Sequence, residues 1–276
     1  MMIRLRAGMK KWRFRFMERL NKQMVEAPAR PVRVLQFGEG NFLRAFVDYM
    51  IDIANEKTDF NGSVVLVKPI TFGNLDMFHE QDCRYTVMLR GLVEGSPVEM
   101  SRTITSVSDA VDAYGEYEKY AAYAKLDTLR FIVSNTTEAG IVLDENDRFD
   151  LCPPNTYPGK LTKFLFERAE AFDYAQDKGL IILPVELIDD NGIELKRCVK
   201  ALVKLWKLGE KFEKWLDEKL GNEKMEKLII AVAVVLSVLF SVGLFMLLPT
   251  AIAGLVEFFT DSVLVRNLVD AVLRIA

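Results

Sequence analysis

The chain has 276 residues, 50% of them hydrophobic, and a formal net charge of -3. That length can bury a substantial core in one large or two smaller domains, so a folded protein is expected and not a disordered one. The single histidine excludes a mechanism with two imidazoles, and three widely spaced cysteines exclude a disulfide framework or a CxxC zinc site.

The charge is unevenly distributed along the chain. Residues 1–34 carry ten Lys and Arg against two Asp and Glu, whereas the remainder carries 26 basic and 37 acidic residues. We expect residues 1–30 to be a basic extension, without the apolar stretch of a secretory signal. It is either an upstream extension of a start near Met17 or a segment that lies on an anionic membrane surface. The acidic body disfavours nucleic acid as a partner, because it repels phosphates.

The first predicted elements form a strand-turn-helix unit. Residues 32–37, VRVLQF, are a short apolar run typical of a strand, and GEGNFLRAFVDYMIDIANE follows with apolar side chains at helical spacing. Gly62 then precedes VVLV, a second buried-strand pattern. Two strands joined through a helix predict a parallel sheet.

Strands and helices continue to alternate along the chain. Further strands are predicted at 84–91, 129–135 and 179–187, and further helices at 112–125, 158–172 and 193–208. The repeated alternation predicts a Rossmann-like, doubly wound α/β domain over residues 31–219.

Residues 220–276 have a different character. Residues 228–248 contain 21 consecutive residues without charge, roughly 30 Å of helix at about 1.5 Å per residue, which matches the hydrocarbon core of a bilayer. We expect a transmembrane helix there and an amphipathic helical tail after it, although a buried core helix is the alternative. Lysines at 219, 224 and 227 precede the span. They favour a cytoplasmic location for the N-terminal domain of a membrane-anchored protein.

The glycine turn between the first strand and helix is the main candidate site. Gly38 and Gly40 permit a tight turn and close backbone approach to a pyrophosphate, although Leu43 replaces the third glycine of the usual fingerprint. An ordinary tight turn is the alternative. The candidate cofactor-binding residues of this turn are Gly38, Glu39, Gly40, Asn41, Phe42, Leu43 and Arg44.

Two further groups of polar residues follow predicted strands. Lys68 ends the second strand, where an acidic residue usually binds ribose hydroxyls; it could meet a 2′-phosphate, which favours NADP, or be a solvated loop lysine. The segment 134–140, SNTTEAG, follows another strand, so it is either a binding loop or a polar turn. Its candidate cofactor-binding residues are Ser134, Asn135, Thr136 and Glu138.

Several linked motifs resemble the mannitol dehydrogenase family, in its tagaturonate reductase (altronate oxidoreductase) branch. They are QFGEGNFLRAFVDYMID, QDCRYTVMLRG, RFIVSNTTEAGI, PGKLTKFLFERA and PVELIDDNG, and the resemblance covers about residues 20–218. It implies a cytoplasmic enzyme of hexuronate catabolism that transfers hydride between NAD(H) and a sugar acid. The resemblance favours NAD over NADP, with residues 35–46 as the nucleotide-binding turn.

The sequence departs from this family pattern in one respect. The family continues into a helical domain with a catalytic Lys, Asn and His, and no KxxxxNxxH occurs in this sequence. His79 lies in the wrong domain for that role. We therefore assign no catalytic residue and no metal ligand, and we expect no turnover by this chain alone.

From about residue 224 onward the sequence resembles the DUF1385 family of bacterial membrane proteins. A change of family pattern near 218–224 indicates a fusion, a frame error or a chimeric chain. The alternatives are a membrane-anchored reductase and a non-enzymatic membrane protein that binds a nucleotide or a sugar acid.

Overall fold

A computed structural model describes residues 19–93, 95–136 and 140–220 of this protein. The greater part of the predicted basic extension, the predicted span at 228–248, the tail and Glu138 lie outside these ranges. Within them, no helix combines the length and hydrophobicity needed to cross a membrane.

Five parallel strands form the central sheet. They are β1 (Val32–Phe37), β2 (Ser63–Lys68), β5 (Val107–Asp112), β6 (Phe131–Ser134) and β7 (Ile181–Pro184). Their order is β5-β2-β1-β6-β7, and every neighbouring pair is parallel. The chain moves outward from β1 in one direction and then returns to the other side of β1, which defines a doubly wound sheet. The predicted Rossmann-like fold is therefore confirmed.

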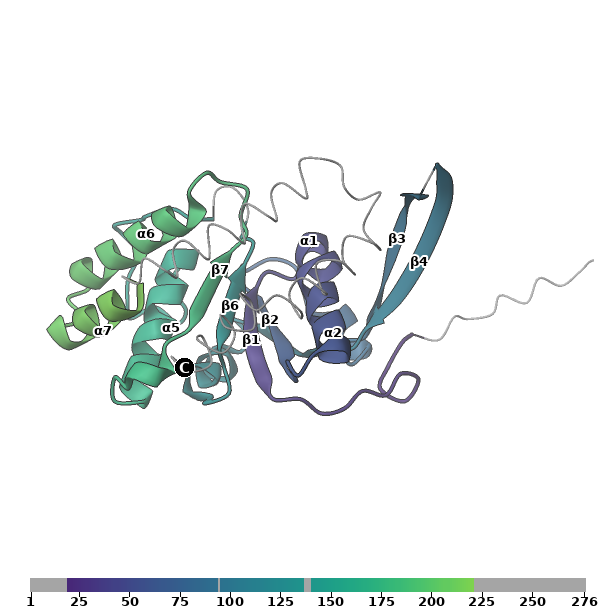
Figure 1. The fold of residues 1–276 in the computed structure, drawn as a ribbon. Helices are drawn as coiled ribbons and strands as arrows, with labels where there is room; N and C mark the ends of the chain where they lie inside the picture. The colour runs from purple at the N-terminus through teal and green to yellow at the C-terminus, as the bar shows by residue number, and fades with distance from the viewer. Residues whose placement is uncertain (1–18, 94, 137–139, 221–276) are drawn as a thin grey trace, which may run out of the picture.

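Helices cover both faces of this sheet (Figure 1). The helices are α1 (Asn41–Ala45), α2 (Val47–Lys57), α3 (Asp76–Glu80), α4 (Tyr117–Ala122), α5 (Tyr157–Ala171), α6 (Asn191–Leu205) and α7 (Glu210–Leu220), with short 3-10 turns at Tyr123–Lys125 and Gln176–Lys178. One buried cluster packs the helices α4 through α7 against one face of the sheet. A second cluster packs the helices α1 through α3 against the other face. Because β2 has water on neither face, all six of its residues are buried, as its apolar run predicts.

Arg168 connects α5 to the loops that precede β6 and β7. Its side chain is fully buried, and its Nη1 donates to the carbonyl oxygens of Ala124 and Leu126, both at 2.9 Å. Its Nε donates to the carbonyl oxygen of Lys178 at 2.7 Å. Burial lowers the pKa of Arg168 to about 10, so the group stays a cation at neutral pH. These bonds fix α5 against the sheet and so fix where its first turn lies.

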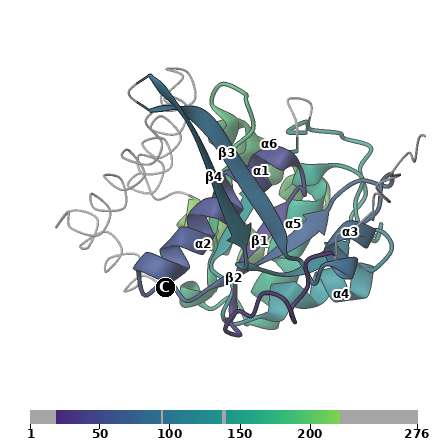
Figure 2. The ribbon, with the colours of Figure 1, turned by 90° about the vertical axis from the view of Figure 1, so that its right-hand side faces the viewer.

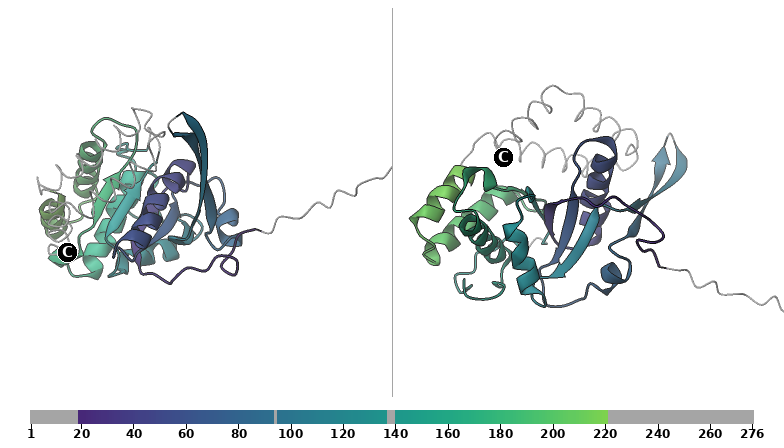
Figure 3. Two further views of the ribbon diagram at one scale, coloured as in Figure 1. Left: turned by 45° about the vertical axis from the view of Figure 1, so that its right-hand side comes forward. Right: turned by 90° about the horizontal axis from the view of Figure 1, so that it is seen from below.

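The strand predicted at 84–91 is not part of the parallel sheet. It is β3 (Tyr85–Val93), which pairs antiparallel with β4 (Ser96–Ile104) in a separate two-stranded sheet. Side chains of β3 alternate between buried Tyr85 and Val87 and exposed Thr86 and Met88, a period that suits a hairpin with one covered face. Figures 2 and 3 show this hairpin projecting beyond α2.

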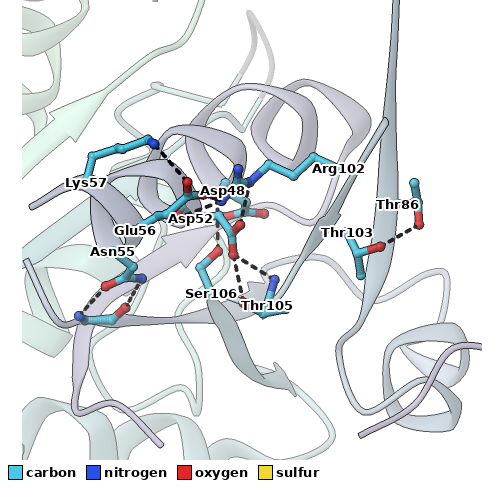
Figure 4. A network of polar contacts seen from close by, with 11 residues as sticks. Asp48, Asp52, Asn55, Glu56, Lys57, Thr86, Arg102, Thr103, Thr105 and Ser106 are labelled. Carbon is cyan, nitrogen blue, oxygen red and sulfur yellow. Dashed lines mark hydrogen bonds and ion pairs between the residues drawn. The ribbon is translucent and has the colours of Figure 1, made fainter. Parts of the chain in front are cut away.

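A network of charged and polar side chains attaches the base of the hairpin to α2 (Figure 4). Arg102 of β4 donates to the Asp52 carboxylate at 2.6 Å and to Glu56 at 2.7 Å. The other Asp52 oxygen accepts from the backbone N–H of Thr105 at 2.8 Å. The Ser106 hydroxyl adds a bond to the carbonyl oxygen of Asp48 at 3.1 Å.

Three predicted boundaries are wrong. The helix predicted at 112–125 begins only at Tyr117, because Asp112 is the last residue of β5. The sequence did not predict β5, because its segment VSDAVD contains two aspartates. The strand accommodates these aspartates because it lies at the edge of the sheet and is exposed on one side. The helix after the glycine turn is interrupted at Phe46, and β7 occupies only the middle of the strand predicted at 179–187.

Candidate functional site

The candidate site lies at the carboxyl ends of β1, β2 and β6. The chain leaves β1 toward β2 and later returns to β6 on its other side. The edge between β1 and β6 is therefore the switch point of the sheet, the place where ligands of doubly wound sheets bind. The structure brings the turn after Phe37 and the segment after Ser134 together at this edge.

Gly38 makes the first bend of the turn. Its φ of +115° is a conformation that L side chains rarely adopt, and an added Cβ would lie 3.0 Å from the carbonyl oxygen of Asn135. Its N–H donates to the carbonyl oxygen of Val67 at 3.0 Å. Only glycine lets the β1 turn contact both neighbouring strand ends in this way.

Gly40 has a different environment. It is the N-cap of α1, with an ordinary φ of -69° and no side-chain cap, and an added Cβ would have no protein atom within 4 Å. The fold of the described residues therefore does not require glycine here. The open space beside a first helical turn is what the backbone approach of a phosphate group requires.

The turn is supported from below by three buried residues that the sequence did not single out. Gln36 of β1 donates from Nε2 to the carbonyl oxygen of Gly38 at 3.2 Å and to Asp48 Oδ2 at 3.4 Å. The same Asp48 oxygen accepts from the Tyr85 hydroxyl at 2.6 Å. Burial raises the pKa of Asp48 to about 7, although the bonds from Tyr85 and Gln36 and the charge of Arg44 oppose this rise.

The remaining residues of the predicted turn lie on different sides of α1. Asn41 is exposed and Phe42 is half-buried, whereas Leu43 is buried in the core beneath Gly38. The Arg44 guanidinium lies 5.6 Å from the ring centres of both Phe78 and Tyr85 and donates to the Asn41 side chain. Its Nε is buried without a hydrogen-bond partner.

Lys68 is neither a solvated lysine nor an unpaired cation. Its side chain is 1% exposed, and its Nζ lies 3.0 Å from Asp112 Oδ2 and 2.7 Å from the carbonyl oxygen of Ile70. The solvated-loop alternative is therefore wrong. Glu39 lies in the same region: burial raises its pKa, while the charges of Lys68 and Arg44 act to lower it.

The segment after β6 contributes a second polar group. Asn135 donates from Nδ2 to the carbonyl oxygen of Val185 at 2.8 Å, and Thr136 donates from both N and Oγ1 to Glu186 Oε1 at 3.1 Å. Ser134 Oγ and Glu186 Oε2 are buried without a hydrogen-bond partner. Burial raises the pKa of Glu186, so this carboxyl can hold a proton closer to neutral pH than an exposed one.

The sequence did not single out Gln36, Asp48, Asp112 or Glu186. A polar residue inside an apolar run, such as Gln36 in VRVLQF, could have identified the first of these. Asp112 was hidden in a predicted helix and Glu186 in a predicted strand. Among the residues in the described ranges, no group of three or more His, Cys, Asp and Glu could hold a metal ion.

The geometry is that of a Rossmann-type domain with its candidate nucleotide site at the switch point. The Mannitol dehydrogenase Rossmann domain model matches residues 32–225. The chain therefore belongs to the mannitol dehydrogenase family. A second model, of a protein of unknown function (DUF1385), matches residues 195–276.

Curated relatives agree with this family. The chain is 47% identical over 205 residues to an altronate oxidoreductase of Phocaeicola vulgatus, covering 74% of this chain and 43% of the relative. It is 46% identical over 203 residues to an altronate oxidoreductase of Bacillus subtilis, covering 73% of this chain and 42% of the relative. The chain thus spans less than half the length of these relatives.

Solved structures support the fold. A mannitol 2-dehydrogenase of Pseudomonas fluorescens, in a ternary complex with NAD and D-mannitol, has a TM-score of 0.60 and 19% identity. A D-sorbitol dehydrogenase in substrate-free form has a TM-score of 0.57 and 19% identity. Each match covers 73% of this chain and 45% of the other.

The buried carboxyl beneath the turn predicts a pH dependence of stability. Because the pKa of Asp48 is raised to about 7 in the folded state, the folded protein keeps a proton that the unfolded chain has lost. As the pH rises from roughly 4 to 7, the free energy of unfolding of the wild type should therefore fall relative to that of Asp48→Asn, by up to ~1.4 kcal/mol per pH unit. Urea titrations across this range measure the difference.

Asp59→Asn is the matched control, since Asp59 is exposed near the end of the same helix. It should retain the wild-type pH dependence. Parallel stability curves for wild type and Asp48→Asn would mean that Asp48 is already ionised in the folded protein.

Proposed function

We propose that this chain is the nucleotide-binding part of an NAD-dependent oxidoreductase of the altronate oxidoreductase type. The enzyme would transfer a hydride between NAD(H) and a sugar acid, with tagaturonate and altronate as the pair. The observation that carries the proposal is the Gly38–Gly40 turn at the switch point, in a chain 47% identical to an altronate oxidoreductase.

The residues at the switch point have the chemistry that a dinucleotide requires. The open side of Gly40 leaves room for the backbone to approach the pyrophosphate. We assign Ser134, Asn135 and Thr136, at the carboxyl end of β6, to the nicotinamide ribose, with Glu138 as a further proposed contact. The Ser134 hydroxyl, which has no hydrogen-bond partner in the described residues, is a polar atom that a ligand or water can satisfy. NAD itself would supply the hydride acceptor.

We propose that 228–248 anchors this domain to a membrane, with the domain on the cytoplasmic side. The support is the uncharged 21-residue stretch and the lysines that precede it. The DUF1385 match over 195–276 overlaps the end of the Rossmann match. In the described residues α7 still packs into the α/β core through Phe212 and Trp215, so we place the junction of a fused chain after α7.

Two glycine substitutions test nucleotide binding. Gly40→Ala should fold with wild-type stability, because its Cβ meets no protein atom within 4 Å, yet it should bind NADH at least about tenfold more weakly because the methyl group occupies the pyrophosphate space. Gly38→Ala should lose both binding and roughly 1–2 kcal/mol of stability, since its backbone becomes strained. NADH fluorescence titration and thermal melting of the full chain measure the two effects.

Gly209→Ala controls for strain alone. Gly209 also has a positive φ, of +91°, but it lies between α6 and α7. This variant should lose stability and keep NADH affinity. If the wild-type chain fails to bind NADH, or Gly40→Ala binds it unchanged, the proposal does not hold.

Turnover requires a proton donor beside the substrate carbonyl, and the family's KxxxxNxxH groups do not occur in these 276 residues. We therefore expect the chain with bound NADH to leave tagaturonate unreduced. Following NADH absorbance after addition of tagaturonate checks this, with a purified altronate oxidoreductase as the positive control. Consumption of NADH would contradict the expected loss of turnover.

Membrane attachment is tested by alkaline carbonate extraction of cell membranes. The full chain should stay in the membrane pellet. A variant with Leu236→Arg and Leu239→Arg should move to the supernatant, because each central arginine costs about 2.5–3.5 kcal/mol on insertion scales. Release of the wild-type chain by carbonate would exclude a spanning helix.

A further inference from the structure

The ends of β2 and β5 present an unusual charge arrangement. Rossmann domains that use NAD commonly carry an acidic residue at the end of the second strand, where it binds the adenosine ribose. Here that strand ends in Lys68. The acidic residue is instead on the neighbouring strand, because Asp112, the last residue of β5, is in register with Lys68.

The two side chains join across the gap between these strands. Parallel strands lie about 4.8 Å apart, and the Lys68 Nζ lies 3.0 Å from Asp112 Oδ2. The lysine side chain is 1% exposed and the aspartate side chain 29% exposed. The carboxylate is therefore the member of the pair that faces solvent, while the ammonium is directed into the protein and also binds the carbonyl oxygen of Ile70.

The carboxylate is held in place and ionised. Its Oδ1 accepts from the backbone N–H of Tyr114 at 2.9 Å. Burial acts to raise the pKa of Asp112, but the bond from Lys68 and the backbone N–H groups of Tyr114 and Gly115 outweigh it and keep the pKa below its usual value. An ionised, oriented carboxylate accepts hydrogen bonds from a diol and repels a phosphate dianion.

Two further charged residues, Glu39 and Arg44, come from the segment after β1. Glu39, from the glycine turn, is near enough to interact electrostatically with Lys68, Asp112 and Arg44. Arg44 is the opposing charge, but its guanidinium lies over the rings of Phe78 and Tyr85, on the core side of α1.

Given the proposed binding of a nicotinamide dinucleotide, we infer that Asp112 accepts hydrogen bonds from the adenosine ribose hydroxyls and excludes a 2′-phosphate. Lys68 orients this carboxylate and offsets the burial of its charge. The acidic group that selects NAD has thus moved from the second strand to its neighbour, and the lysine at the usual position supports it.

Three dinucleotides test this assignment on the full chain: NADH, NADPH and the 2′-deoxyadenosine analogue of NADH. The wild type should bind NADH at least about tenfold more tightly than either of the others, as expected when a site built for a hydroxyl meets an analogue without it. Asp112→Asn should bind NADH more weakly and lose most of the difference between NADH and the 2′-deoxy analogue.

Asp112→Asn leaves the buried Lys68 ammonium without its carboxylate partner, so this variant can unfold. The double variant Lys68→Met with Asp112→Asn avoids the unpaired charge and tests the same assignment. It removes both charges and should likewise fail to distinguish the ribose from the deoxyribose. Asp109→Asn is the matched control, because Asp109 is also a lysine-paired aspartate of β5, bound to Lys119 at 2.8 Å. It should keep the wild-type order of affinities.

The outcomes separate this assignment from the proposed function. A wild-type chain that binds none of the three dinucleotides contradicts the proposed function itself. A chain that binds NADH, but whose Asp112→Asn variant and double variant still disfavour the deoxy analogue, overturns the role of Asp112 alone. If the wild type binds NADPH as tightly as NADH, and Arg44→Met loses the binding of NADPH, the role of Asp112 is overturned and Arg44 binds the 2′-phosphate.

Discussion

The close approach of two backbone segments at Gly38 sets the geometry of the site. The chain must reverse direction after β1, donate to Val67 on one side and pass within contact of the Asn135 carbonyl on the other. A side chain at this position would push these segments apart, because its Cβ would lie 3.0 Å from a carbonyl oxygen. The switch point depends on this contact, since it fixes how the segments after β1 and β6 lie beside each other.

Buried polar groups then hold the turn in place. Gln36 connects the Gly38 carbonyl to Asp48, and Asp48 is in turn held by the Tyr85 hydroxyl from the base of the hairpin. The hairpin is attached to α2 through Arg102 and Asp52. The two-stranded sheet therefore contributes to the candidate site, because it carries one of the hydrogen-bond donors that support the turn.

Oppositely charged side chains pair at the ends of neighbouring strands. Lys68 is buried and pairs with the more exposed Asp112, so the end of the sheet presents a carboxylate to solvent although the second strand ends in a lysine. On the other side of β1, Glu186 accepts from Thr136 and keeps one oxygen unpartnered. Ionisable groups thus flank the glycine turn on both sides, with their charge states set by burial and by their immediate neighbours.

The sequence by itself determined the alternation of strands and helices, the parallel sheet, the glycine turn and the family, because these depend on local periodicity and on residues adjacent in the chain. VVLV after Gly62 predicted a buried strand, and GEG after VRVLQF predicted a tight turn into a helix. The sequence did not determine β5, whose aspartates suit an edge strand as well as a helix start. It also could not show that Lys68 pairs with Asp112, or that Asp48 lies under Gly38. Lys68 and Asp112 are 44 positions apart in the chain, and Gly38 and Asp48 are 10 positions apart and are connected through Gln36. Only the pairing of β2 with β5 and the packing of α2 on the sheet bring these residues together.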